Sequence, residues 1–216
     1  MHEEVSALAA SASWKLASIM RTKRFFNDIE LVNHYKAQVL SYIEYRTAAI
    51  YHVATTNLDT LDRVQTRVLT AVGMSEIEGL LVCRLAPLRA RRDMAMLAVL
   101  HRRVLGRGRK NFVQLLPRLE ADQRTRHTRL HAARHRLQLE ERPNLPDYAA
   151  RGLLGLVIVY SLLPRYIVEE SADVTTFQRS LQALMIERAK GGCQDWAEMY
   201  SPRLARVSHP LLGLLM

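Results

Sequence analysis

Arginine and lysine provide most of the chemistry available to this chain. Its 216 residues include 31 Lys and Arg and 21 Asp and Glu, a formal net charge of +10. Residues 1–83 carry a net charge of −1, residues 84–142 carry +11 and residues 143–216 carry 0. A basic excess confined to one segment is typical of a surface that faces phosphates. The alternative is a solvated surface, but so large an excess in one third of the chain favours the phosphate-facing reading.

We therefore predict sequence-independent binding of RNA, DNA or their hybrid through phosphates. Such contacts fix a protein on the nucleic-acid backbone without reading base edges. The candidate contact residues are Arg89, Arg91, Arg92, Arg102, Arg103, Arg107, Arg109, Lys110, Arg126, Arg129 and Arg134.

One line of a predicted helix alternates arginine with alanine. The line consists of Arg91, Ala95, Ala98 and Arg102. A face of small residues between two arginines allows a phosphate backbone to approach closely, and it equally allows another helix to pack closely. Both interpretations stay open at the level of sequence.

Catalytic motifs are not found in the sequence. Two-metal phosphoryl transfer needs converging carboxylates, and the chain has no Asp-Asp pair. Asp59 and Asp62 fall in the first turn of a predicted helix, where the helix dipole favours acids. There is also no Gly-rich phosphate loop, GxSxG, HExxH or kinase motif set. We predict no catalytic residues, no cofactor and no enzyme activity for this chain.

His127, His131 and His135 have the spacing of zinc ligands on one helix face. Arginines surround them in the sequence and would repel a divalent cation, so we predict no metal site. A solvated basic helix or a nucleic-acid contact remains as the alternative. Cys83 and Cys193 belong to no CxxC or Cys/His cluster, which suits a reducing compartment.

Targeting and membrane signals are not apparent. The N-terminus, MHEEVSALAA, carries acids where a secretory or mitochondrial presequence carries bases. The longest apolar run, from Gly152 to Pro164, is too short to cross a bilayer. The sequence predicts an intracellular protein, nuclear or cytoplasmic, with no membrane contact.

The tyrosines Tyr35, Tyr42, Tyr45 and Tyr51 offer rings on which nucleic-acid bases could stack. Tyrosines at helical spacing are more often core residues with a solvated hydroxyl. We favour the core reading and predict no site there.

Helices must position these residues. Hydrophobic residues make up 49% of the chain, and they recur at three- and four-residue steps, the period of a helix that buries one face. The pattern predicts an all-α or mainly α fold: a multi-helix bundle with a basic, partly irregular middle segment and a smaller C-terminal helical part. We assign residues 1–110 to a helical thumb-like domain, 111–147 to a basic connecting segment and 148–216 to the C-terminal helical part.

Start and stop signals delimit the predicted helices of the first half. One helix covers Val5–Met20, and a second starts at the Asn27–Asp28 cap and continues toward His52. A third follows an Asn57 N-cap and ends at Gly73, where a left-handed residue is favoured. The predicted core residues of these helices are Val5, Leu8, Ala12, Leu16, Ile19, Ile29, Val32, Tyr35, Val39, Ile43, Leu58, Leu61, Val64, Val68 and Val72.

Further signals cover the remainder of the chain. A capping box of Ser75 and Glu78 opens a short helix, and the next helix starts at Pro87 and ends at Gly106. A helical turn is expected at residues 111–116. The apolar run 152–164 is a buried helix or strand, and Thr175 or Thr176 caps a last helix that stops at Gly191 and Gly192.

Three sequence phrases and a tail resemble the region that follows the polymerase palm in non-LTR (non-long-terminal-repeat) retrotransposon reverse transcriptases. The carrying residues are Tyr35, Ile43, Glu44 and Tyr45, then Leu61, Val64 and Gln65, then Leu85, Pro87, Leu88, Arg91 and Arg92, and in the tail Tyr160, Leu163, Pro164 and Phe177. Their order and spacing cover roughly residues 14–203 and make the match more specific than any one phrase.

The resemblance implies a helical thumb and connection region that cradles template and primer by backbone contacts. The fingers, the palm with its aspartate pair, an upstream endonuclease and a downstream Cys/His knuckle are missing from this sequence. RNA-directed DNA polymerase activity is therefore not carried over. We expect a catalytically incomplete fragment whose missing partner is the palm and fingers half of a polymerase.

Two other functions compete with this one. A helix-turn-helix DNA-binding protein could be built around Gly73, but its second helix, EIEGLLVCRL, is apolar and acidic at its start and makes a poor recognition helix. A helical protein-interaction module could instead use Arg91, Arg92, Arg102 and Arg103 to bind an acidic protein partner.

Overall fold

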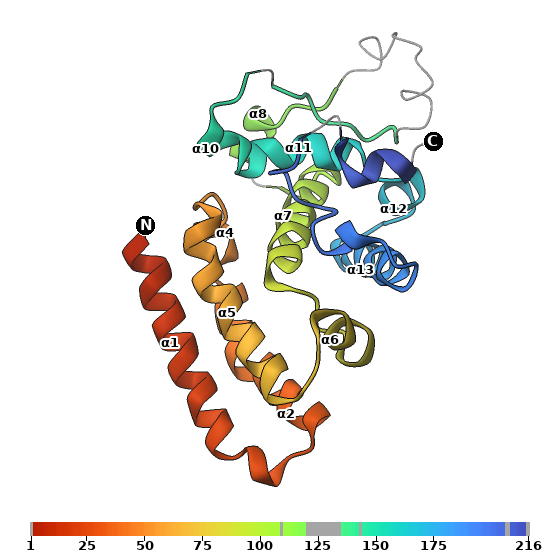
Figure 1. Ribbon diagram of the computed structural model, residues 1–216. Coiled ribbons are helices and arrows are strands. Elements are labelled where there is room, and N and C mark those ends of the chain that lie inside the picture. The colour runs from red at the N-terminus through yellow and green to blue at the C-terminus, as the bar shows by residue number, and fades with distance from the viewer. Residues whose placement is uncertain (1, 109, 120–134, 143, 206–207, 215–216) are drawn as a thin grey trace. The chain divides into compact units, whose positions relative to one another are not determined.

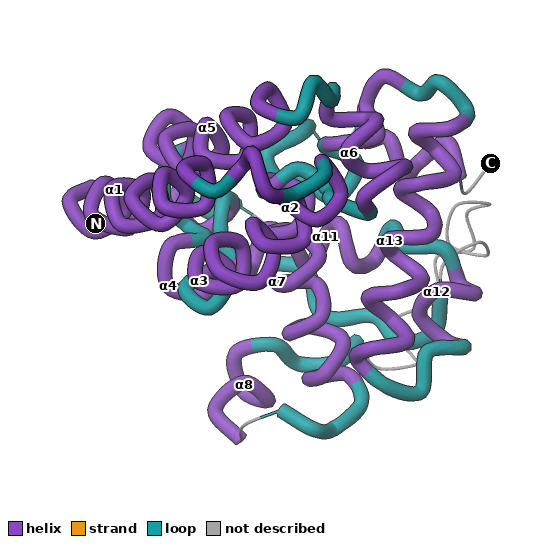
Figure 2. Tube along the Cα trace, turned by 90° about the horizontal axis from the view of Figure 1, so that it is seen from below, coloured by secondary structure: helices purple, strands orange, loops and turns teal. Residues whose placement is uncertain are grey.

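The computed structural model describes residues 2–108, 110–119, 135–142, 144–205 and 208–214. These residues form helices and connecting loops, with no β-strand among them and one isolated antiparallel bridge between Arg118 and Leu139 (Figure 1, Figure 2). The prediction of an all-α fold is confirmed. No helix in this described part combines the length and apolarity needed to cross a membrane.

Two compact units divide the chain, residues 1–92 and residues 93–216. The boundary lies inside helix α7, Leu88–Val104, whereas the sequence pattern suggested a boundary near residue 110. The pattern followed Gly106 and the loss of apolar period after it. Buried residues lie on both sides of Arg92 in α7, and the domain bounds given by the sequence stay a prediction.

The first unit packs around helices α1 and α5, which lie side by side (Figure 1). Its elements are α1 (His2–Arg21), a 3₁₀ turn (Lys23–Phe25), α2 (Asp28–Tyr35), a π-helical segment (Lys36–Leu40), α3 (Ser41–Glu44), α4 (Thr47–Ile50), α5 (Thr55–Ala71) and α6 (Glu76–Cys83). The predicted apolar stripes of α1 and α5 are buried throughout, so both amphipathic helices are confirmed.

Caps in the first unit confirm three sequence signals. Asn27 caps α2 and forms a capping box with Glu30. Ser75 and Glu78 form the predicted box at α6, and Gly73 has a φ of +67° after α5. The two N-terminal caps supply acceptors for amides that the first helical turn leaves unpaired. After α5, the amides of Gly73 and Met74 instead donate to the carbonyls of Thr70 and Leu69.

Two details of the first unit were predicted wrongly. Asn57 does not cap α5, because the helix already starts at Thr55 with Ala54 in the N-cap position. Ile29 is exposed, whereas Leu31 is buried in its place. A π-helical segment, in which the amide of Ser41 donates to the carbonyl of Lys36, widens one turn between α2 and α3. The predicted residues Val32, Tyr35, Val39 and Ile43 are nevertheless buried on both sides of it.

The second unit continues α7 and adds short helices before one long one. They are α8 (Lys110–Leu115), α10 (Asp147–Ala150), α11 (Leu153–Ser161), α12 (Arg165–Glu169), α13 (Val174–Lys190) and 3₁₀ turns at Gln194–Ala197 and Pro210–Leu214. The apolar run of residues 152–164 is therefore mostly a helix, α11. The predicted helical turn near residues 111–116 is confirmed as α8.

The start of α13 corrects another cap. Asp173 is the N-cap, and its carboxylate accepts the amide of Thr176. Thr175 and Thr176 instead lie inside the first turn. Several residues able to cap stand in succession here, and the sequence alone does not show which one leaves the helical conformation. The predicted stop is confirmed, since α13 ends at Lys190 and Gly192 has a φ of +73°.

His101 lies at the centre of the second unit's core. Its ring stacks on Phe177 with centroids 4.1 Å apart. Its Nε2 is 3.0 Å from the carbonyl of Ser171 and its Nδ1 is 3.0 Å from the Tyr160 hydroxyl. A carbonyl only accepts, so Nε2 carries the proton and Tyr160 donates to Nδ1. Two carriers of the family resemblance, Tyr160 and Phe177, thus have a structural role around one buried histidine.

Candidate nucleic-acid interface

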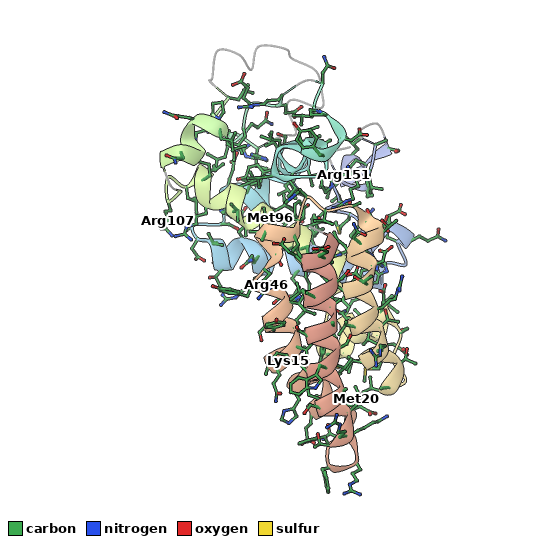
Figure 3. The ribbon with its side chains drawn as sticks, turned by 90° about the vertical axis from the view of Figure 1, so that its left-hand side faces the viewer. Lys15, Met20, Arg46, Met96, Arg107 and Arg151 are labelled. Atoms are coloured by element: carbon green, nitrogen blue, oxygen red, sulfur yellow. The ribbon has the colours of Figure 1, made fainter. Side chains whose placement is uncertain are left out.

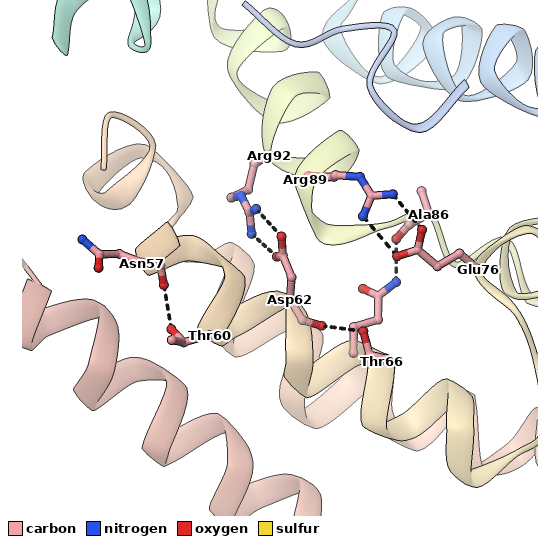
Figure 4. Close-up of polar contacts among 9 residues, drawn as sticks. Asn57, Thr60, Asp62, Thr66, Glu76, Ala86, Arg89 and Arg92 are labelled. Carbon is pink, nitrogen blue, oxygen red and sulfur yellow. Dashed lines mark hydrogen bonds and ion pairs between the residues drawn. The ribbon is translucent and has the colours of Figure 1, made fainter. Parts of the chain in front are cut away.

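The arginines at the start of α7 are held by carboxylates of the first unit (Figure 4). Arg89 donates two hydrogen bonds to Glu76, of 3.1 and 2.7 Å. Arg92 donates two to Asp62, of 2.6 and 2.9 Å. This fork geometry matches a carboxylate well and gives strong, oriented hydrogen bonds.

Arg91 completes the set by pairing with Glu44, at the end of α3. Arg92 is the most enclosed of the three, with 5% of its side chain exposed. Their positive charges are matched within the first unit, where the three pairs hold the first turn of α7 against α3, α5 and α6. Of the sequence candidates, these three have a structural role that does not require a ligand.

The surroundings of Arg91 and Arg92 bring together residues that are far apart in the sequence. Gln65 on α5 donates from Nε2 to the carbonyl of Ala86, 3.0 Å away. Tyr35 on α2 is fully buried near Arg91, Glu44 and Asp62, and burial raises the pKa of its hydroxyl. Contacts therefore join the sequence phrases in pairs: Glu44 of the first phrase with Arg91 of the third, and Gln65 of the second with the carbonyl of Ala86. The Tyr35 hydroxyl itself has no hydrogen-bond partner in the described part of the chain.

The other described candidates gather at the C-terminal end of α7, in the second unit. They are Arg102, Arg103 and Arg107. With Arg118, which was not a candidate but whose charge acts on Arg103, we call them the α7 basic cluster. The Nε of Arg102 donates to the carbonyl of Arg107 at 3.3 Å, and the amide of Arg107 donates back to the carbonyl of Arg102. These two hydrogen bonds hold Arg102 and Arg107 together. Arg107 is labelled in Figure 3.

Arg103 is buried, whereas the other three arginines of the cluster are exposed. It is 8% exposed, and its Nε has no hydrogen-bond partner in the described part of the chain. Burial and, second, the positive charge of Arg118 lower the pKa of Arg103. Arg118 itself is exposed, so two guanidinium groups interact here unfavourably.

No ion pair joins the α7 basic cluster to a carboxylate among the described residues. Cations at the end of a helix are favoured by its dipole, which gives Arg102 and Arg103 a modest structural role. That dipole does not account for Arg118, which lies outside any helix. The cluster can attract phosphate oxygens, since Arg102, Arg107 and Arg118 are exposed to solvent.

Several predicted contacts lie outside the described residues. They are Arg109, Arg126, Arg129 and Arg134, together with the side chain of Lys110, whose backbone begins α8. Sequence reasoning did not select Arg118 and Arg142. Arg142 is exposed and donates to the carbonyl of Leu115 at 3.1 Å. Both belong to the basic block, so the charge count was the signal that could have found them.

The histidine series does not meet in a described site. His127 and His131 lie outside the described residues. His135 is buried, and its Nε2 lies 2.8 Å from the carbonyl of Tyr160. The described part holds no group of three or more His, Cys, Asp or Glu side chains placed to bind a metal.

Helix α6, the second helix of the helix-turn-helix alternative, presents an apolar and acidic face. Its exposed residues are Ile77, Glu78, Leu81 and Val82. A recognition helix requires polar and basic residues at such positions. Nothing on this face favours contact with DNA bases.

Comparison with protein-family models, with curated proteins and with solved structures found no match for this chain.

Proposed function

We propose that this chain binds nucleic acid through the phosphate backbone, without reading base sequence. We further propose that it corresponds to the thumb and connection region of a non-LTR retrotransposon reverse transcriptase. The observation that carries the binding proposal is the +11 net charge of residues 84–142. Part of that charge lies in the α7 basic cluster, where three arginines are exposed and no described carboxylate forms an ion pair with them.

The family proposal rests on the sequence phrases and gains support from their packing. Glu44 of the first phrase pairs with Arg91 of the third, and Gln65 of the second donates to the carbonyl of Ala86, which lies inside the third. Residues that pack together are the ones expected to recur together in a family. The thumb of a polymerase contacts the backbone of its template and primer, which agrees with phosphate contacts that carry no sequence information.

The test is binding of the purified chain to a labelled RNA·DNA hybrid, duplex DNA and single strands over a salt series. Phosphate contacts release counterions, so the logarithm of the binding constant should fall steeply and linearly with the logarithm of salt concentration. Arg102→Ala combined with Arg107→Ala should lower that slope by about two units, equally for all duplex sequences.

A matched control is Arg63→Ala combined with Arg67→Ala, which removes two exposed arginines from α5 in the acidic third of the chain. The control should keep the slope of the unaltered chain. Poly-glutamate as competitor separates the protein-interaction alternative: if it displaces hybrid as effectively as unlabelled hybrid does, the cluster recognises polyanions in general. No binding at low salt by a folded chain would refute the proposal.

A further inference from the structure

In the first unit, two cations contact the ring of one tyrosine, and each cation is next in sequence to an exposed aromatic residue. Tyr42 on α3 is half-buried, and α3 packs against α1. The ammonium of Lys15 on α1 lies 5.1 Å from the centre of the Tyr42 ring, and the guanidinium of Arg46 lies 5.6 Å from it. Two cations from different parts of the unit are therefore gathered on one ring. Figure 3 labels Lys15 and Arg46.

Neither cation has an acidic partner in the described part of the chain. The ion pairs there involve other arginines, and the nearest acid in sequence to Arg46, Glu44, is taken by Arg91. Cation–π contact with Tyr42 holds Lys15 and Arg46 in place without neutralising them. The positive charge remains available to a polyanion.

Two large aromatic side chains adjoin these cations in the chain and are open to solvent. Trp14, beside Lys15, is 70% exposed, and Tyr45, beside Arg46, is 90% exposed. The other tyrosines of this stretch, Tyr35 and Tyr51, are buried. The core reading of the four tyrosines therefore holds for two of them and does not hold for Tyr45.

We propose that Trp14, Lys15, Tyr42, Tyr45 and Arg46, the Tyr42 surface, bind single-stranded nucleic acid. Bases stack on Trp14 and Tyr45 while phosphates contact Lys15 and Arg46, and Tyr42 positions the two cations. Rings for stacking next to cations for the backbone are the combination that sequence-tolerant single-strand binding uses. A paired duplex hides its base faces, so this surface selects single strands.

This inference goes beyond the proposed function and does not depend on the α7 basic cluster, because the two surfaces lie in different units and use different parts of the ligand. The cluster needs only phosphates. The Tyr42 surface also needs unpaired bases, and the experiment separates the two by removing bases from the probe.

The probes are a labelled oligo-dT strand and a strand of equal length built from abasic sugar phosphates. We expect the full chain to bind oligo-dT more tightly than the abasic strand. Trp14→Ala combined with Tyr45→Ala should weaken oligo-dT binding about tenfold or more, the range for loss of stacked bases, and should leave abasic-strand and duplex binding unchanged.

The matched control removes two exposed aromatics elsewhere, Phe25→Ala combined with Tyr148→Ala, and should bind both strands as the unaltered chain does. Since all four side chains are exposed, each variant should keep its melting temperature. Lys15→Ala combined with Arg46→Ala should weaken the binding of both strands, because it removes phosphate contacts.

Fluorescence gives an independent readout. The chain has two tryptophans, Trp14 and Trp196, so Trp196→Phe leaves Trp14 as the only one. Stacking predicts that oligo-dT quenches Trp14 emission and that the abasic strand does not. The proposal is overturned if both strands bind the unaltered chain equally, or if the double aromatic variant keeps its oligo-dT affinity. It is also overturned if Trp14 responds to vesicles of anionic phospholipid or to an acidic peptide but not to oligo-dT.

Discussion

Arg92 shows how an arginine chosen for its charge can serve the fold. Its guanidinium is buried against Asp62, and removing the carboxylate would leave a buried charge without compensation. We predict that Asp62→Asn lowers the free energy of unfolding by about 3 kcal/mol, the lower end for broken buried pairs because Asp62 is partly exposed.

Urea denaturation measures this loss. Asp59→Asn is the matched control, since it is the same substitution one turn earlier in α5 and Asp59 forms no ion pair within the described residues. It should lower the free energy of unfolding by less than about 1 kcal/mol, the value of an acid near a helix N-terminus. Equal losses for the two variants would contradict the structural role of Arg92.

His101 makes the stability of the second unit depend on pH. Burial lowers its pKa below 6.5, and burial also lowers the pKa of His209. The unfolded chain therefore binds the proton more tightly than the folded chain. The stabilisation is fully present above about pH 6.5 and is lost as the pH falls from there toward the folded pKa.

We predict that His101→Gln lowers stability at neutral pH, because stacking on Phe177 is lost, but makes the decline below about pH 6.5 shallower. The lowered pKa of His209 should account for the pH dependence that remains. Thermal melts at a series of pH values provide the measurement, and an unchanged slope in His101→Gln would contradict the assignment.

The sequence was informative about residue types and uninformative about partners. It identified Arg89, Arg91 and Arg92 as noteworthy, but their carboxylates lie 13, 47 and 30 residues away in sequence. A charge count weighs a paired and an unpaired arginine equally. Only the fold separates the arginines that fasten α7 from those of the α7 basic cluster.

At the scale of elements, the cap of α13 depends on one carboxylate. Asp173 accepts the amide of Thr176, and the neighbouring Thr175 lies inside the helix. We predict that Asp173→Ala lowers the free energy of unfolding by about 1 kcal/mol, the usual effect of losing an N-cap side chain. Thr175→Ala should have little effect. If Thr175→Ala lowered the melting temperature more than Asp173→Ala does, the cap would be Thr175, as the sequence suggested, and not Asp173.

The junction of α10 and α11 depends on a residue without a side chain. A Cβ added at Gly155 would lie 1.8 Å from the carbonyl oxygen of Ala150, which belongs to the backbone and cannot rotate aside. We predict that Gly155→Ala lowers the free energy of unfolding by at least about 2 kcal/mol. Gly213→Ala, where nothing lies within 4 Å, is the control for urea denaturation and should change little.

Helices with a regular apolar period were predictable, and departures from that period were not. The stripes of α1 and α5 follow from three- and four-residue spacing alone. Ile29 is exposed although Val32, Tyr35, Val39 and Ile43 of the same predicted stripe are buried, because it lies in the first turn of α2, where no neighbour covers it. The exposure of Trp14 and Tyr45 likewise depends on which neighbours pack beside them, a property of the fold and not of the spacing.

At the scale of the molecule, each unit carries one tryptophan, Trp14 in residues 1–92 and Trp196 in residues 93–216. A ligand stabilises the structure that binds it by about 2.7 kcal/mol at a hundred times its dissociation constant. With Trp14→Phe, the emission of Trp196 reports the second unit. We predict that RNA·DNA hybrid delays this transition in urea and that Arg102→Ala combined with Arg107→Ala abolishes the delay. If the hybrid still delays the unfolding of this variant, the contacts with the hybrid lie outside Arg102 and Arg107.

The π-helical segment Lys36–Leu40 also makes chain length itself a constraint. Each residue of a helix turns the chain by about 100°, so deleting one residue here would rotate everything that follows by that angle. Glu44 would turn away from Arg91, and Tyr42 would carry its ring away from Lys15. A shortened variant would thus keep nearly every side chain and lose both arrangements. In any lineage of related chains, insertions and deletions between Asn27 and Glu44 should be rarer than substitutions at the same positions.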